Sequence, residues 1–300
     1  MKVEQIYTKC LAQGTYFIES QGEVAIIDPL REVTPYIEKA KRINAKIKYI
    51  FETHFHADFV SGHLTLSKVS GAPIIYGPNA NPDFETIIAK DGQEFPLGDS
   101  TIVALHTPGH TLESTTYLLQ DKDGKDTAIF SGDTLLLGDV GRPDLSQKAK
   151  DITKEDLASL LYDSLRVKIM PLSNDVIVYP AHGAGSACGK NMMKKTLDTL
   201  GNQKKTNYAL REDMTREEFI AEVTDGLEPP PQYFPLNAKL NKSGYDDIDS
   251  ILERGMEALT TDAFEVLANE TGAIMLDVRH QNDFVKGLSL IHISEPTRPY

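Results

Sequence analysis

Two histidines and an aspartate alternate within residues 53–59, which read Thr-His-Phe-His-Ala-Asp-Phe. Imidazole and carboxylate groups are the ligands that zinc and iron take from proteins, and His54, His56 and Asp58 supply three of them in a short stretch. An apolar run at residues 47–51 comes just before and is typical of a buried strand. The spacing therefore predicts a metal-ligand turn at the carboxyl end of a strand, where α/β proteins build their sites. A polar loop with unrelated histidines is the alternative.

Three further residues of the same kind stand in comparable places along the chain. They are His110, Asp133 and His182, and each lies in or beside a turn that contains glycine or proline and follows a strand-like run. Four strand ends would then each deliver a histidine or an aspartate, and such repetition is hard to explain by packing alone. The six side chains together predict a metal site.

The same residues match, in order and spacing, the five motifs of the metallo-β-lactamase superfamily, which the sequence resembles over about residues 1–240. The resemblance implies an α/β (α+β) fold, a four-layer αβ/βα sandwich with the metal at one edge of its two sheets. In that superfamily an aspartate at the place of Asp28 commonly supports the metal loop, so Asp28 is a candidate for this role. A plain turn residue is the alternative for Asp28.

Position 59 departs from the pattern of the superfamily. Many members carry a histidine directly after His-x-His-x-Asp, where it helps to hold a second zinc ion, whereas this chain carries Phe59. A phenyl ring cannot bind a metal, and the loss of an imidazole should weaken a second site. We therefore expect one metal ion, with a second ion on Asp58, Asp133 and His182 as the alternative.

The composition argues against several classes of protein. The chain of 300 residues has 31 basic and 44 acidic side chains and a net charge of −13, which is unlike a nucleic-acid binder. No apolar run approaches the roughly 20 residues of a membrane span, and the first residues lack the pattern of a secretion signal. The two cysteines, Cys10 and Cys188, argue against a disulfide framework and fit a reducing cytoplasm.

Strands and helices are expected around the turns that carry these residues. Apolar runs and alternations indicate strands at residues 3–7, 15–19, 24–28, 72–76, 101–106, 114–120, 127–130 and 176–179. Helical patterns indicate helices at residues 34–43, 59–70, 154–166, 189–200 and 215–224. Residues 137–145, which are rich in glycine and charge, are expected to form a loop too polar for the core.

Three stretches narrow the resemblance: residues 54–59, the Arg-Pro-Asp of residues 142–144, and residues 181–189. Together they resemble the persulfide dioxygenases, in their bacterial form fused to a rhodanese domain. The resemblance implies one Fe(II) ion per chain, O2 and a thiol persulfide such as glutathione or coenzyme A persulfide as substrates, and sulfite and free thiol as products. The implied iron ligands are His54, His110 and Asp133, while His56, Asp58 and His182 would line or support the site or serve as additional ligands.

Two imidazoles and one carboxylate on one face of iron are the facial triad of Fe(II) oxygenases, which leaves positions open for substrates. Arg142 is expected to steer the anionic thiol carrier through charge-assisted hydrogen bonds, and Asp144 to orient the loop of Arg142. Tyr179 completes the expected substrate-binding residues. Cys188 lacks an identifiable partner base and is expected to be a packed residue or a pocket wall rather than a nucleophile.

The C-terminal part carries a second, partial resemblance. Residues 276–279, Asp283-Phe284 and Gly287 look like the opening of a rhodanese domain, after which the sequence departs abruptly and contains no cysteine. We therefore expect a catalytic domain at residues 1–245, an incomplete rhodanese-like α/β segment at 246–287 without sulfurtransferase activity, and a non-native tail at 288–300. An apolar strand at residues 273–276 is expected to be exposed in this segment.

Two other functions stay open beside the dioxygenase. One is a zinc thiolester hydrolase of the glyoxalase II type, which would use a metal-activated water and prefers two metals. The other is a non-catalytic metal- or thiol-sensing protein. The sequence does not distinguish iron from zinc, since both accept histidine and aspartate, and it leaves a homodimer or homotetramer open.

Overall fold

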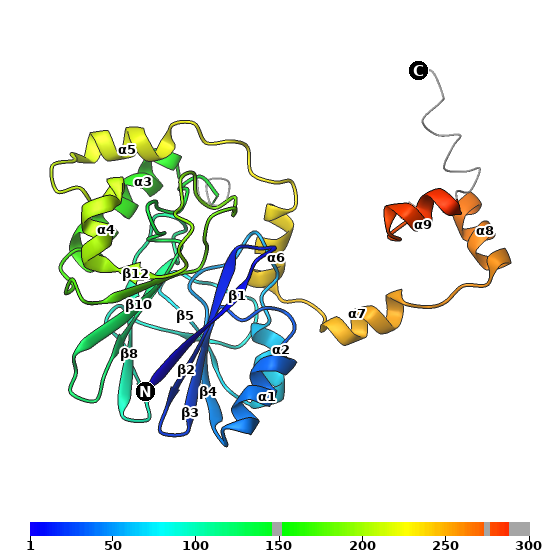
Figure 1. Ribbon diagram of the computed structural model, residues 1–300, viewed down its shortest axis with the longest axis horizontal. Helices are drawn as coiled ribbons and strands as arrows, with labels where there is room; N and C mark the ends of the chain where they lie inside the picture. Colours follow the sequence, from blue (N-terminus) through cyan, green and yellow to red (C-terminus); the bar gives the residue numbers. More distant parts are fainter. Residues whose placement is uncertain (146–151, 273–276, 288–300) are drawn as a thin grey trace. The chain divides into compact units, whose positions relative to one another are not determined.

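The structure is a computed structural model that describes residues 1–145, 152–272 and 277–287. The chain forms two units, Met1–Ile248 and Asp249–Tyr300. The residues expected to form the metal site all belong to the first unit, which is an αβ/βα sandwich of two sheets covered by helices on both outer faces (Figure 1).

The first sheet begins as an antiparallel meander and continues with parallel strands. Its strands, in spatial order, are β1 (Lys2–Thr8), β2 (Gln13–Ser20), β3 (Glu23–Ile27), β4 (Lys46–Phe51), β5 (Ile74–Tyr76) and β6 (Ile87–Ile88). Because β3, β4 and β5 run parallel, their carboxyl ends meet at one edge of the sheet. Asp28 follows β3 at that edge, and residues 52–62 follow β4.

The second sheet has a parallel pair at the place where the site residues emerge. In spatial order it contains β12 (Asp198–Thr199), β11 (Ile177–Pro180), β10 (Asp126–Gly132), β9 (Thr115–Gln120), β8 (Ser100–His106) and β7 (Glu94–Leu97). The strands β10 and β11 are parallel, so that Asp133 and His182 leave the sheet at the same edge. The other pairs in this sheet are antiparallel.

Aromatic rings fill the space between the two sheets. Phe51 of the first sheet lies 4.6 Å from Tyr117 of the second, and Tyr16 lies 4.9 Å from Phe130, measured between ring centroids. All four rings are fully buried. Such packing holds the two sheets face to face, and it brings together the loops at their common edge.

Helices cover the two outer faces of the sandwich. The helices of the first unit are α1 (Thr34–Arg42), α2 (His63–Ser70), α3 (Lys154–Ser164), α4 (Leu200–Thr206), α5 (Arg216–Thr224) and α6 (Phe234–Ser243), with a π-helical turn at Leu165–Ile169 and a 3-10 turn at Tyr208–Leu210. Figure 1 shows α1 and α2 beside the first sheet and α3, α4 and α5 beside the second. The four-layer arrangement expected from the sequence is therefore confirmed.

The helix α3 shows how the sequence specifies an element of the outer layer. Thr153 and Asp156 form a capping box at its start, in which each side chain accepts a hydrogen bond from the backbone of the other. Leu157, Leu161 and Leu165 recur at helical spacing and are fully buried, and Leu161 and Leu165 belong to the core cluster that contains Ile129 and Val178 of the second sheet. The amphipathic helix expected here is thus confirmed.

Two helices expected from periodicity differ in the structure. No helix forms at residues 189–198, where the backbone N–H of Met193 donates to the Leu137 carbonyl at 2.8 Å instead of to the carbonyl of Gly189. The helix α2 begins at His63, four residues later than expected, because the preceding backbone bonds to a distant side chain, Asn241. Partners far along the chain override the local pattern in both places.

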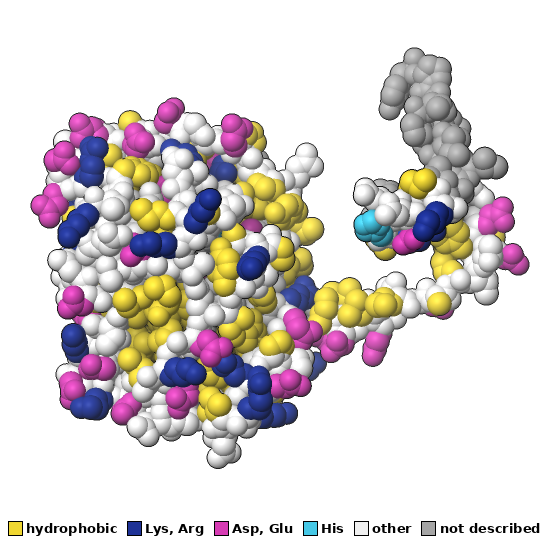
Figure 2. All heavy atoms as spheres, in the orientation of Figure 1, with side chains coloured by type: hydrophobic (Ala, Val, Ile, Leu, Met, Phe, Trp, Pro, Cys, Tyr) yellow, Lys and Arg dark blue, Asp and Glu magenta, His cyan; other side chains and the backbone are white. Residues whose placement is uncertain are grey.

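The second unit contains short helices with exposed apolar side chains. These are α7 (Ile248–Gly255, which begins one residue before the unit boundary), α8 (Thr261–Glu270) and α9 (Gln281–Lys286). Leu252, Met256 and Phe264 are at least 44% exposed, and Figure 2 shows apolar side chains along the surface of α7. The expected strand at 273–276 and the tail at 288–300 lie outside the described residues, and the rhodanese-like assignment stays a prediction.

Within residues 1–145, 152–272 and 277–287, no helix is long and apolar enough to cross a membrane.

Candidate metal centre

Three of the predicted ligands converge where the two sheets meet. His54 follows β4, His110 lies in the turn after β8, and Asp133 follows β10 directly. The Asp133 Oδ2 atom is 3.5 Å from His110 Nε2 and 4.0 Å from His54 Nε2. All three donor atoms lie within 4.8 Å of one another, and the three residues are buried. The sandwich thus assembles two imidazoles and one carboxylate from strand ends that are 79 residues apart in the chain at most.

Hydrogen bonds fix the tautomers of both histidines. Thr53 Oγ1 donates its only proton to Asp28 Oδ2 at 2.8 Å, so that at 3.0 Å it can only accept from His54 Nδ1. The His110 Nδ1 atom donates to the carbonyl oxygen of Arg142 at 2.8 Å. In both rings Nε2 therefore carries the free lone pair, and both Nε2 atoms face Asp133. This is the arrangement that a metal ion requires of two histidine ligands.

The Asp133 carboxylate has one satisfied oxygen and one free oxygen. Asp133 Oδ1 accepts from His182 Nδ1 at 2.7 Å, whereas the buried Oδ2 has no hydrogen-bond partner in the described part of the chain. An unsatisfied buried polar atom costs about 1–3 kcal/mol, and more when charged. A cation held by His54, His110 and Asp133 would remove this cost, so the donor set present here fits a metal ion.

The imidazole of His182 is held between two carboxylates. Its Nδ1 bonds to Asp133, and its Nε2 lies 2.8 Å from Asp58 Oδ2. Burial disfavours the charged imidazole, but Asp133 and Asp58 outweigh it and raise the pKa of His182 well above its usual value. Burial likewise disfavours the charged form of Asp133, yet His182 lowers the pKa of that carboxyl. In this arrangement His182 is a cationic bridge between two carboxylates.

The charge state of His54 suits a metal ligand. Burial, together with the imidazoles of His56 and His110, lowers the pKa of His54 well below its usual value. The ring is therefore neutral at physiological pH, as a metal requires of imidazole.

A second group of potential ligands lies beside the first. His56, Asp58 and His182 also place donor atoms within 4.8 Å of one another. Phe59 is buried and packs against the ring of His56, with centroids 4.4 Å apart. Because Phe59 offers no donor atom, a second ion here would depend on His56, Asp58 and His182, of which His182 has both nitrogens engaged.

Asp28 supports the loop that carries the first ligands, as was weighed from the sequence. Its carboxylate accepts from the Thr53 backbone N–H and hydroxyl, each at 2.8 Å, and lies 3.1 Å from His56 Nε2. Asp28 has a φ of +51°, a left-handed conformation that costs free energy outside glycine. The surrounding bonds hold this aspartate against the metal loop.

The loop at residues 137–145 is buried, contrary to the expectation that it is too polar for the core. Arg142 is only 6% exposed. Its guanidinium bonds both oxygens of Asp144 at 2.6 and 2.7 Å and donates to the Glu228 carbonyl. The Asp144 carboxylate thus orients Arg142. The bonds to Asp144 and to the Glu228 carbonyl engage the guanidinium and offset the cost of burying its charge. A substrate-steering role for Arg142 would require these bonds to open.

Gly141 in the same loop permits a close backbone approach to the ligands. A Cβ atom at this position would lie 2.2 Å from the Asp133 carbonyl oxygen and 2.8 Å from His110 Nδ1. Any side chain at position 141 would therefore displace a ligand residue.

Two other residues were singled out from the sequence, and the sulfur of one of them, Cys188, lies within 4.8 Å of donor atoms of Asp133 and His182. Tyr179 stacks on Phe130 between the sheets, with centroids 5.3 Å apart, and does not line the pocket described below. Cys188 is buried against Ala57 and Phe234, and burial raises the pKa of its thiol to about 12. The neutral thiol agrees with a packed residue rather than a nucleophile.

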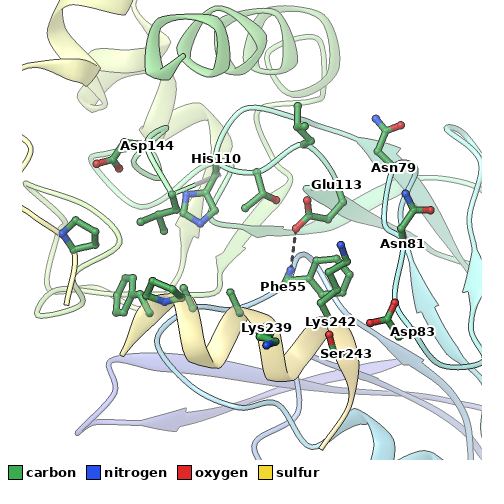
Figure 3. A pocket seen from close by; sticks show the side chains of 18 residues that line it. Phe55, Asn79, Asn81, Asp83, His110, Glu113, Asp144, Lys239, Lys242 and Ser243 are labelled. Atoms are coloured by element: carbon green, nitrogen blue, oxygen red, sulfur yellow. Dashed lines mark hydrogen bonds between the residues drawn. The ribbon is translucent and has the colours of Figure 1, made fainter. Parts of the chain in front are cut away.

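A pocket of about 680 Å³ opens beside the ligands. His110 and Asp144 lie at one end, whereas Asn81 lies towards the other, and α6 forms one wall (Figure 3). The apolar side chains that line the pocket include Phe55, Ala57, Leu112, Leu145, Phe234 and Ala238. Lys239 and Lys242 project from α6 at this wall. The pocket can therefore hold a molecule with an apolar or thiol end near His110 and an anionic end near the lysines.

A model of the metallo-beta-lactamase superfamily matches residues 9–182, which include all the histidines and aspartates of both ligand groups. The chain belongs to the metallo-beta-lactamase superfamily. Its His and Asp cluster is accordingly a metal-binding site of this superfamily.

Relatives within the superfamily differ in the activities that their names state. The cytoplasmic hydroxyacylglutathione hydrolase of Arabidopsis thaliana is 32% identical over 181 residues, 59% of this chain and 66% of that enzyme. This chain thus spans slightly under two thirds of that relative. The human mitochondrial persulfide dioxygenase ETHE1 is 28% identical over 243 residues, 80% of this chain and 87% of the relative. A solved metallo-beta-lactamase from Staphylococcus aureus superposes with a TM-score of 0.75 at 32% identity, covering 82% of this chain and 73% of that one.

The superfamily motifs locate the ligands, but not the groups that hold the ligand loop. Glu113 accepts from the Phe55 backbone N–H at 3.2 Å, and Asn241 bonds to the backbone at three points of the same loop. Glu113 lies only three residues after His110, whereas Asn241 lies far from every motif in the sequence.

Proposed function

We propose that this chain is a non-haem Fe(II) persulfide dioxygenase. The observation that carries the proposal is the trio His54, His110 and Asp133, with both Nε2 lone pairs and one free carboxylate oxygen facing one another. Two imidazoles and one carboxylate are the facial triad of Fe(II) oxygenases. The engagement of His182 by two carboxylates and the presence of Phe59 favour one ion over two.

A ferrous ion bound by the trio would supply the redox chemistry that couples O2 to the oxidation of sulfur. Overall, one thiol persulfide, one O2 and one water become one free thiol, one sulfite and two protons. The terminal sulfur is oxidised, O2 is reduced, and the sulfur–sulfur bond breaks so that the carrier leaves as its thiol. Glutathione persulfide and coenzyme A persulfide are the substrates we propose, with no nucleic acid or membrane partner.

The side chains of the pocket would bind and orient the persulfide. The apolar side chains of Phe55, Leu145 and Phe234, which line the pocket, would exclude water around the bound persulfide. Orientation of the reacting groups at this end would account for a large part of the rate. Lys239 and Lys242 offer positive charge to the carrier, a role that the sequence had suggested for Arg142.

The lysines of α6 give a testable expectation. Changing Lys239 or Lys242 to glutamate should raise KM for an anionic persulfide about twofold to fivefold each, because exposed charge pairs contribute about 0.2–1 kcal/mol. The maximal rate should change little, since neither side chain belongs to the ligand trio. Steady-state O2 uptake at several ionic strengths measures both parameters. A KM that rises equally for an uncharged alkyl persulfide would contradict an electrostatic role.

The function itself is tested by O2 uptake and sulfite formation. The Fe(II)-loaded protein is given glutathione persulfide or coenzyme A persulfide in a sealed electrode cell, and sulfite is quantified. Equal amounts of O2 consumed and sulfite formed are expected. Absence of uptake with both substrates, in protein shown to contain iron, would overturn the proposal.

The second candidate is a thiolester hydrolase of the glyoxalase II type. The group His56, Asp58 and His182 supports it, because a second ion could bind there if His182 released Asp58. The similarity to hydroxyacylglutathione hydrolases points the same way. Hydrolysis of a glutathione thiolester by the zinc-loaded protein would favour it. Location in the cytoplasm and a homo-oligomeric state stay predictions, and a non-catalytic sensor is the weakest alternative.

A further inference from the structure

The loop that carries His54, His56 and Asp58 has almost no support of its own. Residues 54–60 make no backbone–backbone hydrogen bonds within the part of the chain that the structure describes. Side chains from other elements therefore have to hold the loop. The Glu113 carboxylate accepts a hydrogen bond from the Phe55 N–H, but it does not bond to the segment around Asp58.

That segment is held by Asn241, which is buried in α6 at 1% exposure. Its amide nitrogen donates to the carbonyl oxygens of His56 and Phe59 at 2.7 and 2.8 Å. Its amide oxygen accepts from the Ser61 backbone N–H at 2.8 Å. The side chain of Asn241, 180 or more residues away in the sequence, thus bonds to the backbone on both sides of Asp58.

The turn that carries Asp58 connects to the ligand trio through a chain of short contacts. Asp58 Oδ2 lies 2.8 Å from His182 Nε2, and His182 Nδ1 lies 2.7 Å from Asp133 Oδ1. A shift of the turn would move Asp58, then His182, and finally the carboxylate that faces His54 and His110. Asn241 forms no hydrogen bond with His54, His110 or Asp133, so it would act on them only through these intermediates.

The same helix also forms a wall of the pocket. Ala238 and Lys242 of α6 line the pocket, while Asn241 lies between them and the metal loop, joined to the backbone beside Ala57. The position of the pocket wall and the geometry of the metal centre are therefore set by one helix.

We propose that Asn241 is a positioning residue that fixes α6 to the metal loop and thereby sets both the ligand geometry and the pocket wall. The proposal rests on the metal site and not on the dioxygenase reaction, because its test can be made without substrate. Removing the hydrogen bonds of Asn241 should loosen the ion and change its coordination.

The test uses Asn241→Ala and Asn241→Asp loaded with cobalt(II). Aspartate keeps the size and the acceptor for Ser61 but cannot donate to His56 and Phe59, so it isolates the two carbonyl bonds. Asn237→Ala is the matched control, because it removes the same side chain one turn earlier in α6. The Asn237 side chain forms no hydrogen bond with any residue that the structure describes. Release of cobalt to a chelator, the visible absorption spectrum and the melting temperature of the metal-free protein are measured.

Both Asn241 variants are expected to release cobalt at least about tenfold faster than the wild type, as for other groups that orient metal ligands. Their visible spectra should be altered, whereas Asn237→Ala should match the wild type in both. Wild-type release and spectrum in either folded variant would overturn the proposal, and a lower melting temperature alone would show a merely structural role. If the alanine variant does not fold, the aspartate variant decides by the same two readouts. Failure of O2 uptake in the wild type would leave this test intact.

Discussion

Replacing His110 by alanine should abolish both iron binding and O2 uptake. The imidazole supplies one of the three donor atoms. Without it, only His54 Nε2 and Asp133 Oδ2, which are 4.0 Å apart, would remain to bind the ion. Loss of groups that merely orient ligands costs about 10–100-fold in metal affinity or activity, so that loss of a ligand should cost more than about a hundredfold. Iron content after gel filtration and kcat/KM for glutathione persulfide are the measurements.

His106→Ala is the matched control for this prediction. His106 also lies at the end of β8, but its ring bonds to the Leu112 carbonyl and is not among the ligand groups. The control protein should retain iron. Iron content near the wild-type level in His110→Ala would show that the trio His54, His110 and Asp133 is not the ligand set. A loss of iron in both variants would point instead to collapse of the turn at residues 107–114.

Exchanging the bound metal from iron to zinc should eliminate O2 uptake without unfolding the protein. Zinc has no accessible redox change, yet it accepts the same histidine and carboxylate ligands as iron. The melting temperature should rise on addition of either metal, because a ligand that binds only the folded state stabilises it. O2 uptake, sulfite formation and melting temperature are compared for the metal-free, iron and zinc forms.

The same experiment separates the two candidate functions. A dioxygenase is active only with iron, and the zinc form should neither consume O2 nor hydrolyse a thiolester at a substantial rate. If the zinc form hydrolyses a glutathione thiolester and binds two ions per chain, the hydrolase is correct. The second ion would then have to bind at His56, Asp58 and His182 in spite of Phe59.

The local sequence predicted the strands and the ligand turns well because their signals are short-range. Short continuous apolar runs specify strands such as β8 and β9, and the capping box at Thr153 specifies the start of α3. Periodicity failed at residues 189–198, where the backbone N–H of Met193 donates to the Leu137 carbonyl instead of to a helical carbonyl. A partner that distant in the chain leaves no trace in a helical pattern.

Substrate contacts were harder to predict than ligands. Arg142 was an attractive candidate because of its charge, but the folded chain pairs it with Asp144 and buries it. Lys239 and Lys242 carry no sequence signal of substrate binding, since lysines are common on exposed helices. Only the packing of α6 beside the metal loop brings them to the pocket.

By itself the sequence determined the kind of chemistry. Each ligand turn can be recognised from a few neighbouring residues, namely the ligand type and the strand-like run before it. His54, His56, Asp58, His110, Asp133 and His182 were all identifiable in this way. The tertiary structure decided how the six are divided, since the tautomers, the free oxygen of Asp133 and the bridging of His182 depend on partners distant in the chain. It also decided what holds the loop, because hydrogen bonds such as those of Asn241 form only after two sheets and a late helix have packed together.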